Sequence, residues 1–305
     1  MPALLDVRKR IAAVGNMKKI TQAMELVAAS KMKRFQDKAF AKRAYAQALV
    51  RGLALCEADA REIALTQPRE SGAVMFVLFS SNRGLCGGLN AQLSRALFRS
   101  AQWKDLAPAD RLLVTVGRKA SEAARQEGVE PTERFEAFAD DLTTVKALEI
   151  ANHLLEYWTN ETCREIVLVS PRYVNAFTYE PTKKTYLPLD AKFLQESWKA
   201  KEGKDETKEQ ESWLFYEPSR EHVIERLSLQ LSWSLLTSAF FEFKASEYSS
   251  RMVAMRHATE AAEDIIHSMT REYHKARQAQ ITQQLAELAG ASEAMNAESL
   301  ELDYV

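Results

Sequence analysis

A glycine-rich stretch, SSNRGLCGGLN at residues 80–90, holds the residues of this sequence best suited to chemistry. It lies between an apolar run, VMFVLF (74–79), and a helical pattern, which is typical of a turn from a strand into a helix. Such turns can bind phosphate through backbone N–H groups, and a cysteine in one can act as a nucleophile. Three hypotheses follow: a nucleotide site, a catalytic thiol, or a tight turn that is structural or contacts a partner.

The spacing of this stretch argues against the first two hypotheses. A phosphate-binding P-loop ends in Gly-Lys-Ser/Thr, whereas Gly88 is followed by Leu89 and Asn90. Its three glycines do not have the GxGxxG spacing of a dinucleotide site. A catalytic thiol would need a histidine partner, and all five histidines stand on predicted helices outside any triad context. The sequence therefore predicts no catalytic, cofactor or metal site, and the turn is structural or faces a partner.

Two long windows without proline, 3–67 and 219–305, predict long helices at the two ends of the chain. In the second window, apolar residues alternate at spacings of four and three, which is the heptad pattern of a coiled coil. Its members are Tyr248, Met252, Met255, Thr259, Ala262, Ile266, Met269, Tyr273 and Ala276. A looser stripe in the first window comprises Leu4, Val7, Ile11, Val14, Met17, Ile20, Met24, Val27, Met32 and Phe35. We expect the two helices to pair antiparallel.

The middle of the chain predicts an α/β domain. Strand candidates at 74–79, 111–117 and 165–170 alternate with helical stretches at 90–102, 118–127 and 142–159, and a further strand candidate covers 176–187. This alternation is typical of a mostly parallel sheet covered by helices. The segment 199–211 is almost wholly charged, which favours a loop.

Charge and composition bound the class of protein. The net charge of −1 hides a basic end, because residues 1–43 hold eleven Lys and Arg against three acidic residues. Such an end indicates a polyanionic partner, either nucleic acid or an acidic protein surface, or a solvated helix face. No apolar run approaches the roughly 20 residues of a membrane-spanning helix. The three cysteines are far apart in sequence, which favours a reducing compartment.

Three segments together resemble the gamma subunit of F-type ATP synthases. They are IAAVGNMKKITQAMELVAASKMKR (11–34), the glycine-rich stretch 80–90, and the C-terminal SEYSSRMVAMRHATEAAEDII with YHKARQAQITQQLAEL. The resemblance runs over nearly the whole chain. It implies a long antiparallel coiled coil of the terminal helices, mounted on a Rossmann-like α/β domain with a mostly parallel sheet. It also implies a central rotor that couples proton flow through the c-ring to ATP synthesis or hydrolysis on the α3β3 ring.

The resemblance assigns contacts to partner subunits rather than to a substrate. One copy would serve each complex, bound to the α and β subunits, the ε subunit and the c-ring, with no cofactor and no catalytic site of its own. The residues that it places against the catalytic subunits are Lys18, Lys19, Met24, Arg83, Cys86, Arg277, Gln278 and Thr282. Tyr216 and Glu217, in SWLFYEP (212–218), would contact the c-ring.

The implied location is the cytoplasmic side of a bacterial inner membrane, where the chain would be peripheral. Similarity begins almost at Met1, which leaves no room for a mitochondrial presequence. The sequence departs from the family at His274, where asparagine is usual, in an acidic tail at 291–305, and in lacking the paired-cysteine insertion of chloroplast members.

We therefore divide the chain into five parts: an N-terminal shaft helix (1–67), the α/β domain (68–190), a charged loop and foot segment (191–218), a C-terminal shaft helix (219–290) and the acidic tail (291–305). Two rival hypotheses remain. A basic coiled-coil nucleic-acid-binding or scaffold protein would use the first 43 residues, although only Phe35 and Phe40 could stack on bases there. A small-molecule α/β enzyme would need a pocket motif that the sequence lacks.

Overall fold

The computed structural model describes residues 2–56, 63–136, 144–189 and 215–302. The chain divides into two compact units, one formed by Val27–Ala254 and the other by Met1–Leu26 with Met255–Val305. Two long helices, α1 (Pro2–Leu55) and α7 (Arg220–Leu302), each contribute to both units. The predicted charged segment 199–211 lies outside the described residues.

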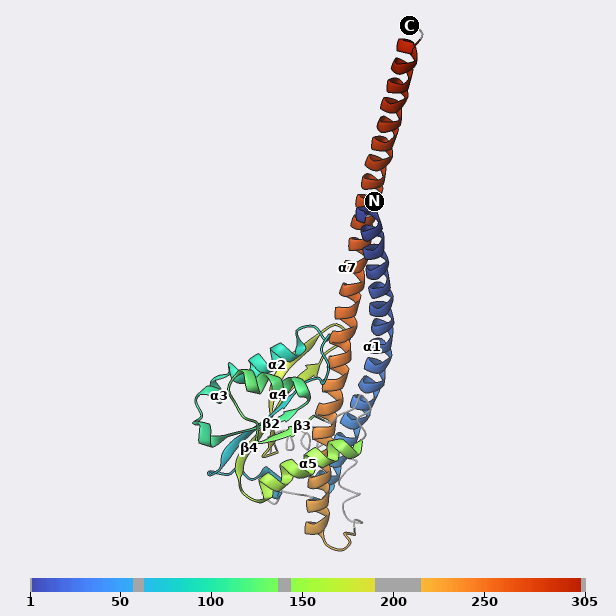
Figure 1. The fold of residues 1–305 in the computed structure, drawn as a ribbon. Helices are drawn as coiled ribbons and strands as arrows, with labels where there is room; N and C mark the ends of the chain where they lie inside the picture. The colour runs from blue at the N-terminus through green and yellow to red at the C-terminus, as the bar shows by residue number, and fades with distance from the viewer. Residues whose placement is uncertain (1, 57–62, 137–143, 190–214, 303–305) are drawn as a thin grey trace. The chain divides into compact units, whose positions relative to one another are not determined.

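A five-stranded sheet forms the centre of the larger unit (Figure 1). Its strands are β1 (Ala73–Phe79), β2 (Arg111–Val116), β3 (Glu133–Phe135), β4 (Cys163–Tyr173) and β5 (Tyr179–Leu187), in the order β3-β2-β1-β4-β5. The first four strands in that order are parallel, and β5 pairs antiparallel with β4. The expected α/β fold with a mostly parallel sheet is therefore confirmed. The sequence analysis missed β3, because Phe135 is the only apolar residue in that strand.

Helices α2 (Leu89–Phe98), α4 (Arg118–Gln126) and α5 (Thr144–Thr159) pack on the sheet, together with a short helix, α3 (Ala101–Lys104). Two single turns of 3-10 helix, η1 (Ala64–Thr66) and η2 (Pro108–Asp110), lie in the connections. On one face of the sheet Phe76 makes an edge-to-face contact with Trp103 of α3, with the ring centroids 5.2 Å apart.

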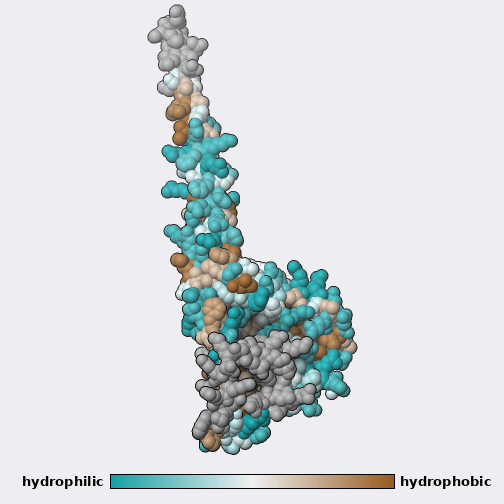
Figure 2. Space-filling model, turned by 180° about the vertical axis from the view of Figure 1, so that it is seen from behind, coloured by the Kyte–Doolittle hydropathy of each residue, from teal (hydrophilic) through white to brown (hydrophobic). Residues whose placement is uncertain are grey.

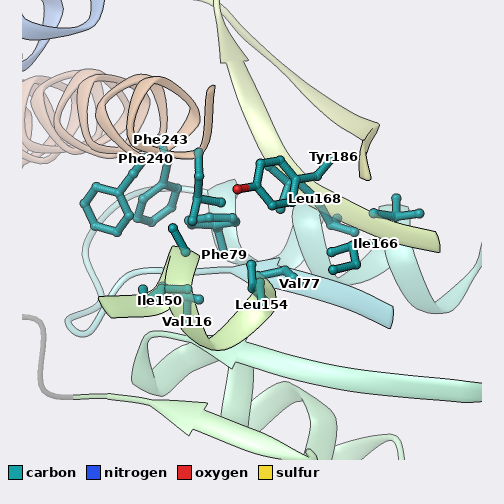
Figure 3. Packing of buried hydrophobic residues seen from close by; sticks show 14 of the residues in the cluster. Val77, Phe79, Val116, Ile150, Leu154, Ile166, Leu168, Tyr186, Phe240 and Phe243 are labelled. Atoms are coloured by element: carbon teal, nitrogen blue, oxygen red, sulfur yellow. The ribbon is translucent and has the colours of Figure 1, made fainter. Parts of the chain in front are cut away.

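The opposite face of the sheet holds the core that joins it to α7 (Figure 3). Val77, Phe79 and Leu168 lie between Leu154 of α5 and the aromatic rings of α7. Two buried rings of α7 lie beside Phe79, with centroid distances of 5.9 Å for Phe240 and 5.8 Å for Phe243. Since aromatic side chains bury large areas and prefer such inclined contacts, α7 is part of this core.

Within the same unit another side of α7 packs along α1, and the two helices run antiparallel. Phe35 of α1 stacks on Tyr248 with centroids 5.6 Å apart, and Arg43 forms an ion pair with Glu242 at 2.8 Å. Farther along α1, the Tyr45 hydroxyl donates to Gln230. Residue numbers of the contacts therefore fall along α7 as they rise along α1, which shows that the two helices are antiparallel.

Within the smaller unit, α1 and α7 are joined by polar contacts. The Thr21 and Thr259 hydroxyls lie 2.7 Å apart, and Lys18 forms an ion pair with Glu263 at 3.0 Å. On α7 the predicted heptad members from Tyr248 to Tyr273 are buried or half-buried, whereas Ala276 is exposed.

The predicted stripe on α1 was partly wrong. Met17 and Ile20 are each 59% exposed and Val27 is 55% exposed. The seam instead passes through Lys18 and Thr21, because strict spacings of three and four from Val14 reach those positions. Apolar residue type was therefore a poorer guide than the heptad spacing in this part of α1.

We expect Phe243→Ala to lower the free energy of unfolding by about 3–5 kcal/mol, because it empties a buried aromatic site between α7 and the sheet. Urea unfolding followed by tryptophan fluorescence measures the change. The matched control is Phe177→Ala, since that ring is 66% exposed and its loss is expected to shift the midpoint little. Equal midpoints for the two variants would contradict the role given to Phe243.

Candidate functional site

The glycine-rich loop connects β1 to α2 and encloses its own cysteine. The Cys86 side chain is 2% exposed, and its sulfur accepts a hydrogen bond from Asn90 Nδ2 at 3.2 Å. Asn90 also donates to the Ser81 hydroxyl at 2.8 Å and accepts from the Ser81 backbone N–H at 3.0 Å. The Asn90 amide therefore ties the start of the loop to α2. An amide cannot remove a proton from a thiol, so these contacts do not activate Cys86 as a nucleophile.

The conformation of the loop depends on two residues with positive φ. Gly87 has φ +57°, where a Cβ atom would lie 3.1 Å from the Ser250 hydroxyl of α7. Leu85 has φ +62°, which is uncommon for a residue with a side chain, and its side chain is 62% exposed. The loop therefore lies close against α7 at Gly87 and directs Leu85 outward.

The two expected contact residues of the loop differ in exposure. Arg83 and Cys86 were both expected against a partner subunit, and the Cys86 thiol is buried in this chain. Arg83 is exposed, and so is Leu85, which the sequence analysis did not name. The outer surface of the loop is therefore formed by a cation next to an apolar side chain.

The expected contact residues on α1 differ in accessibility. Lys18 is half-buried, and its ammonium group forms an ion pair with Glu263 within the chain. Lys19 is exposed, and Met24 is half-buried. Met24 lies near the exposed Met17 and Ile20 by helical spacing, which makes an apolar strip along one flank of α1.

The other three expected contacts are exposed near the end of α7. They are Arg277, Gln278 and Thr282, and the Thr282 hydroxyl donates to the Gln278 carbonyl at 3.0 Å. Between the faces of Arg277 and Gln278 runs an exposed apolar stripe that the sequence analysis missed, made by Ile281, Leu285 and Leu288. Successive members of this stripe are four and then three residues apart, and this helical spacing could have revealed the stripe in the sequence. Figure 2 shows hydrophobic surface along this end of the helix.

The predicted foot residues lie just before α7. The Tyr216 hydroxyl donates to the Leu55 carbonyl at 3.1 Å, and Arg220 Nε donates to the Cys56 carbonyl at 2.8 Å. These bonds satisfy carbonyl groups at the end of α1, which have no partner within that helix. Glu217 is exposed. Tyr216 therefore secures the foot to α1, and Glu217 presents a carboxylate at the surface.

One cavity of about 590 Å³ lies beside the beginning of α7. Ile63, Trp158 and Ile224 line it, and Arg69 covers the Trp158 ring with its guanidinium 4.1 Å from the ring centroid. Among the residues that the structure describes, no group of three or more His, Cys, Asp or Glu side chains could hold a metal ion. The lining also includes Ser228, whose hydroxyl donates to the Glu225 backbone carbonyl at 2.7 Å.

The described parts of the chain contain no helix that combines the length and the apolar content needed to cross a bilayer.

Comparison with known proteins gives one consistent result. Residues 3–295 match a family model described as ATP synthase. The chain is 32% identical over 297 residues to the ATP synthase gamma chain of Heliobacterium modesticaldum, covering 97% of this chain and 100% of that one. It is 33% identical over 297 residues to the ATP synthase gamma chain of Glaesserella parasuis, covering 96% and 99%.

Solved structures show the same fold in more distant proteins. A chain of the Euglena gracilis mitochondrial ATP synthase, described as OSCP/F1/c-ring in rotational state 3, superposes with a TM-score of 0.65 at 19% identity. The match covers 98% of this chain and 96% of that chain. A chain of the Euglena gracilis rotor in rotational state 1 has a TM-score of 0.61 at 17% identity, covering 92% and 99%.

We expect all three cysteines to react slowly with iodoacetamide in the native chain at pH 8, because all three are buried. Cys163 is expected to be the slowest, since burial raises its pKa to about 11 and leaves little thiolate. Peptide mass spectrometry of timed samples measures each rate, and the chain unfolded in urea is the control. Labelling of native Cys86 as fast as in urea would contradict the enclosed loop.

Proposed function

We propose a function for a chain that belongs to the family of ATP synthase gamma chains. It is a gamma-type component of an ATPase complex, and its proposed role there is the central rotor. In this role it couples proton flow through the c-ring to ATP synthesis or hydrolysis on the α3β3 ring. The proposal that the chain itself carries no catalytic site is supported by the enclosed Cys86 thiol and the exposed or half-buried histidines.

The observation that carries this proposal is the double role of α7. One side of the helix packs into the sheet core through Phe240 and Phe243, and another side pairs with α1 through Tyr248. A force on the α/β domain is therefore delivered to the paired helices through close-packed side chains. Tight packing transmits displacement, since interiors of this density have low compressibility.

The contacts with the catalytic subunits are proposed at three levels of the chain. On α1, the exposed Lys19 and the half-buried Met24 would face the β subunits, while Lys18 stays paired with Glu263. On the glycine-rich loop, Arg83 would take this role, and Cys86 would keep the loop folded from inside.

The third level is the end of α7, where the proposed catch consists of Arg277, Gln278 and Thr282. Their exposure supports this, because a residue that bonds one β subunit at a time must reach outward. The apolar stripe of Ile281, Leu285 and Leu288 would lie against the inner surface of the ring and exclude water beside the catch.

In the foot segment, Glu217 would contact the c-ring, with Tyr216 holding the segment on α1. The ε subunit would be a further partner, and one copy of the chain would serve each complex. The curated relatives named above come from bacteria, which supports a peripheral location on the cytoplasmic side of a bacterial inner membrane.

The alternative of a nucleic-acid-binding coiled coil is not supported by the comparisons. The basic end of the chain also has partners within the chain: Lys18 pairs with Glu263, Lys33 with Asp37, and Arg43 with Glu242. Part of the positive charge that suggested a polyanionic partner is therefore neutralised by ion pairs within the chain.

The catch proposal is tested by Arg277→Ala in a reconstituted complex of three α, three β and one gamma subunit. Loss of one charge-assisted hydrogen bond is expected to cost about 1.5–3 kcal/mol at the interface, which lowers the ATPase rate or the yield of complex. The melting temperature of the free chain should not change, because Arg277 is exposed.

The matched control for this test is Arg271→Ala, an exposed arginine earlier on the same helix. It is expected to behave like the unaltered chain in all three measurements. If Arg277→Ala leaves both rate and yield at the level of the control, the catch does not include this residue. Failure of the unaltered chain to copurify with α and β subunits would instead refute the rotor role.

A further inference from the structure

A buried cluster of charged side chains lies on α7 where that helix meets the glycine-rich loop. The Glu247 side chain is 3% exposed and forms ion pairs with Lys244 Nζ and Arg251 Nη2, each at 2.9 Å. Arg251 is itself 8% exposed. Buried ions persist in a fold only when they are paired and hydrogen-bonded, so this cluster must have a further set of partners.

Those partners are backbone carbonyl groups of the loop. Arg251 Nη2 donates to the Gly84 carbonyl at 3.3 Å and faces the Arg83 carbonyl at 3.5 Å. The neighbouring Ser250 hydroxyl donates to the Cys86 carbonyl at 2.5 Å. One turn of α7 therefore holds three successive parts of the loop by their backbones.

The same turn of α7 also holds the connection between β4 and β5. The Ser249 hydroxyl donates to the Ala176 carbonyl at 2.6 Å. The loop that follows β1 and the loop that follows its parallel neighbour β4 are thus fixed to adjacent serines of one helix. A helix that only covered a sheet would not need such contacts, since apolar packing alone would hold it there.

Glu247 is needed because a buried guanidinium without a counter-charge would carry a large desolvation cost. Burial by itself would lower the pKa of the Arg251 guanidinium, but the Glu247 charge and hydrogen bond raise that pKa above its usual value. Arg251 Nη2 donates both to Glu247 Oε1 and to the Gly84 carbonyl, so the carboxylate holds this nitrogen beside the loop. Lysine at this position could pair with Glu247, but its ammonium lacks the planar geometry that fixes the donors of a guanidinium.

We propose that Glu247 and Arg251 are positioning residues that clasp the loop 82–88 to α7, so that loop and helix turn as one body. Arg83 and Leu85, at the exposed tip of the loop, then deliver the force that they receive from a catalytic subunit to the helix. The clasp itself is inferred from the contacts of this chain, whereas the origin of the force rests on the proposed rotor function.

The first experiment tests the clasp in the isolated chain, with the buried thiol of Cys86 as the probe. Opening of the loop exposes this thiol, so the rate of its labelling by a maleimide reports the open fraction. Arg251→Ala and Glu247→Gln are each expected to raise the rate at Cys86 about tenfold or more, because a charge-assisted contact is lost. Arg251→Lys is expected to give a smaller increase.

Two controls accompany this measurement. Arg256→Ala removes an arginine farther along α7 whose ion pair is with Glu25, and it should leave the rate at Cys86 unchanged. Cys163, buried between the sheet strands, should stay slow in every variant and so reports that the domain remains folded. Should Arg251→Ala fail to fold, Ser250→Ala removes the bond to the Cys86 carbonyl, leaves the buried ion pairs in place and is expected to raise the rate as well. A labelling rate at Cys86 equal to that of the unaltered chain in the folded variants would overturn the clasp.

The second experiment tests what the clasp does, in membrane vesicles that contain the whole ATP synthase with this chain. We expect Arg251→Ala to lower the amount of ATP-driven acidification per ATP hydrolysed, and Arg251→Lys to restore part of it. A ratio at the unaltered level would overturn the force-delivering role even if Cys86 is labelled faster. If the unaltered chain does not assemble into the complex, the rotor function fails, and the labelling result still decides the clasp.

Discussion

The structure depends on the packing of α7 into two cores at once. Around residues 236–251 this helix is buried on nearly every side, which is unusual for a helix that also belongs to a coiled-coil seam. Phe240 and Phe243 fill the sheet side, and Phe241 and Tyr248 face α1. Because both sets of side chains lie on one rigid helix, neither core can rearrange without the other. Within the larger unit, the glycine-rich loop is held against this helix through Ser250 and Arg251.

The contacts between α1 and α7 differ in chemistry between the two units. In the larger unit, aromatic rings and small side chains fill it, as at Phe35 and Ala39. In the smaller unit, Lys18 and Thr21 occupy seam positions and meet Glu263 and Thr259. Polar contacts at seam positions set the register of a coiled coil while adding less stability than apolar contacts. Apolar residues displaced from the seam, such as Met17 and Ile20, are left on the flank, where a partner can bury them.

Much of this architecture was readable from the sequence, and the errors have identifiable causes. The strands β1, β2 and β4 are continuous apolar runs, and the heptad of α7 follows strict spacing, so both were predicted with nearly the right bounds. The ends of the helices were less well predicted. Helix α7 continues to Leu302, through the segment that composition set apart as an acidic tail, because a segment rich in Ala, Glu and Leu forms helix readily. Cys86 shows the limit of local motifs: the resemblance placed it against a partner subunit, and nothing in the sequence indicated that contacts from Asn90 and the packing of α7 enclose it. The division of the chain into five functional parts and the roles of the contact residues stay predictions.

The unequal lengths of the two paired helices have a mechanical consequence. With Thr21 opposite Thr259, the start of α1 at Pro2 falls opposite about residue 278 of α7, so the remaining residues to Leu302 continue as a single helix. That segment is a cantilever, held where the pair ends and stiffened by hydrogen bonds within its own helix. Sideways deflection of a cantilever grows steeply with its free length, whereas two bonded helices resist bending together. A sideways load at residues 277 and 278, where the paired segment ends, would therefore bend the helix little, while the same load near Leu302 would bend it most.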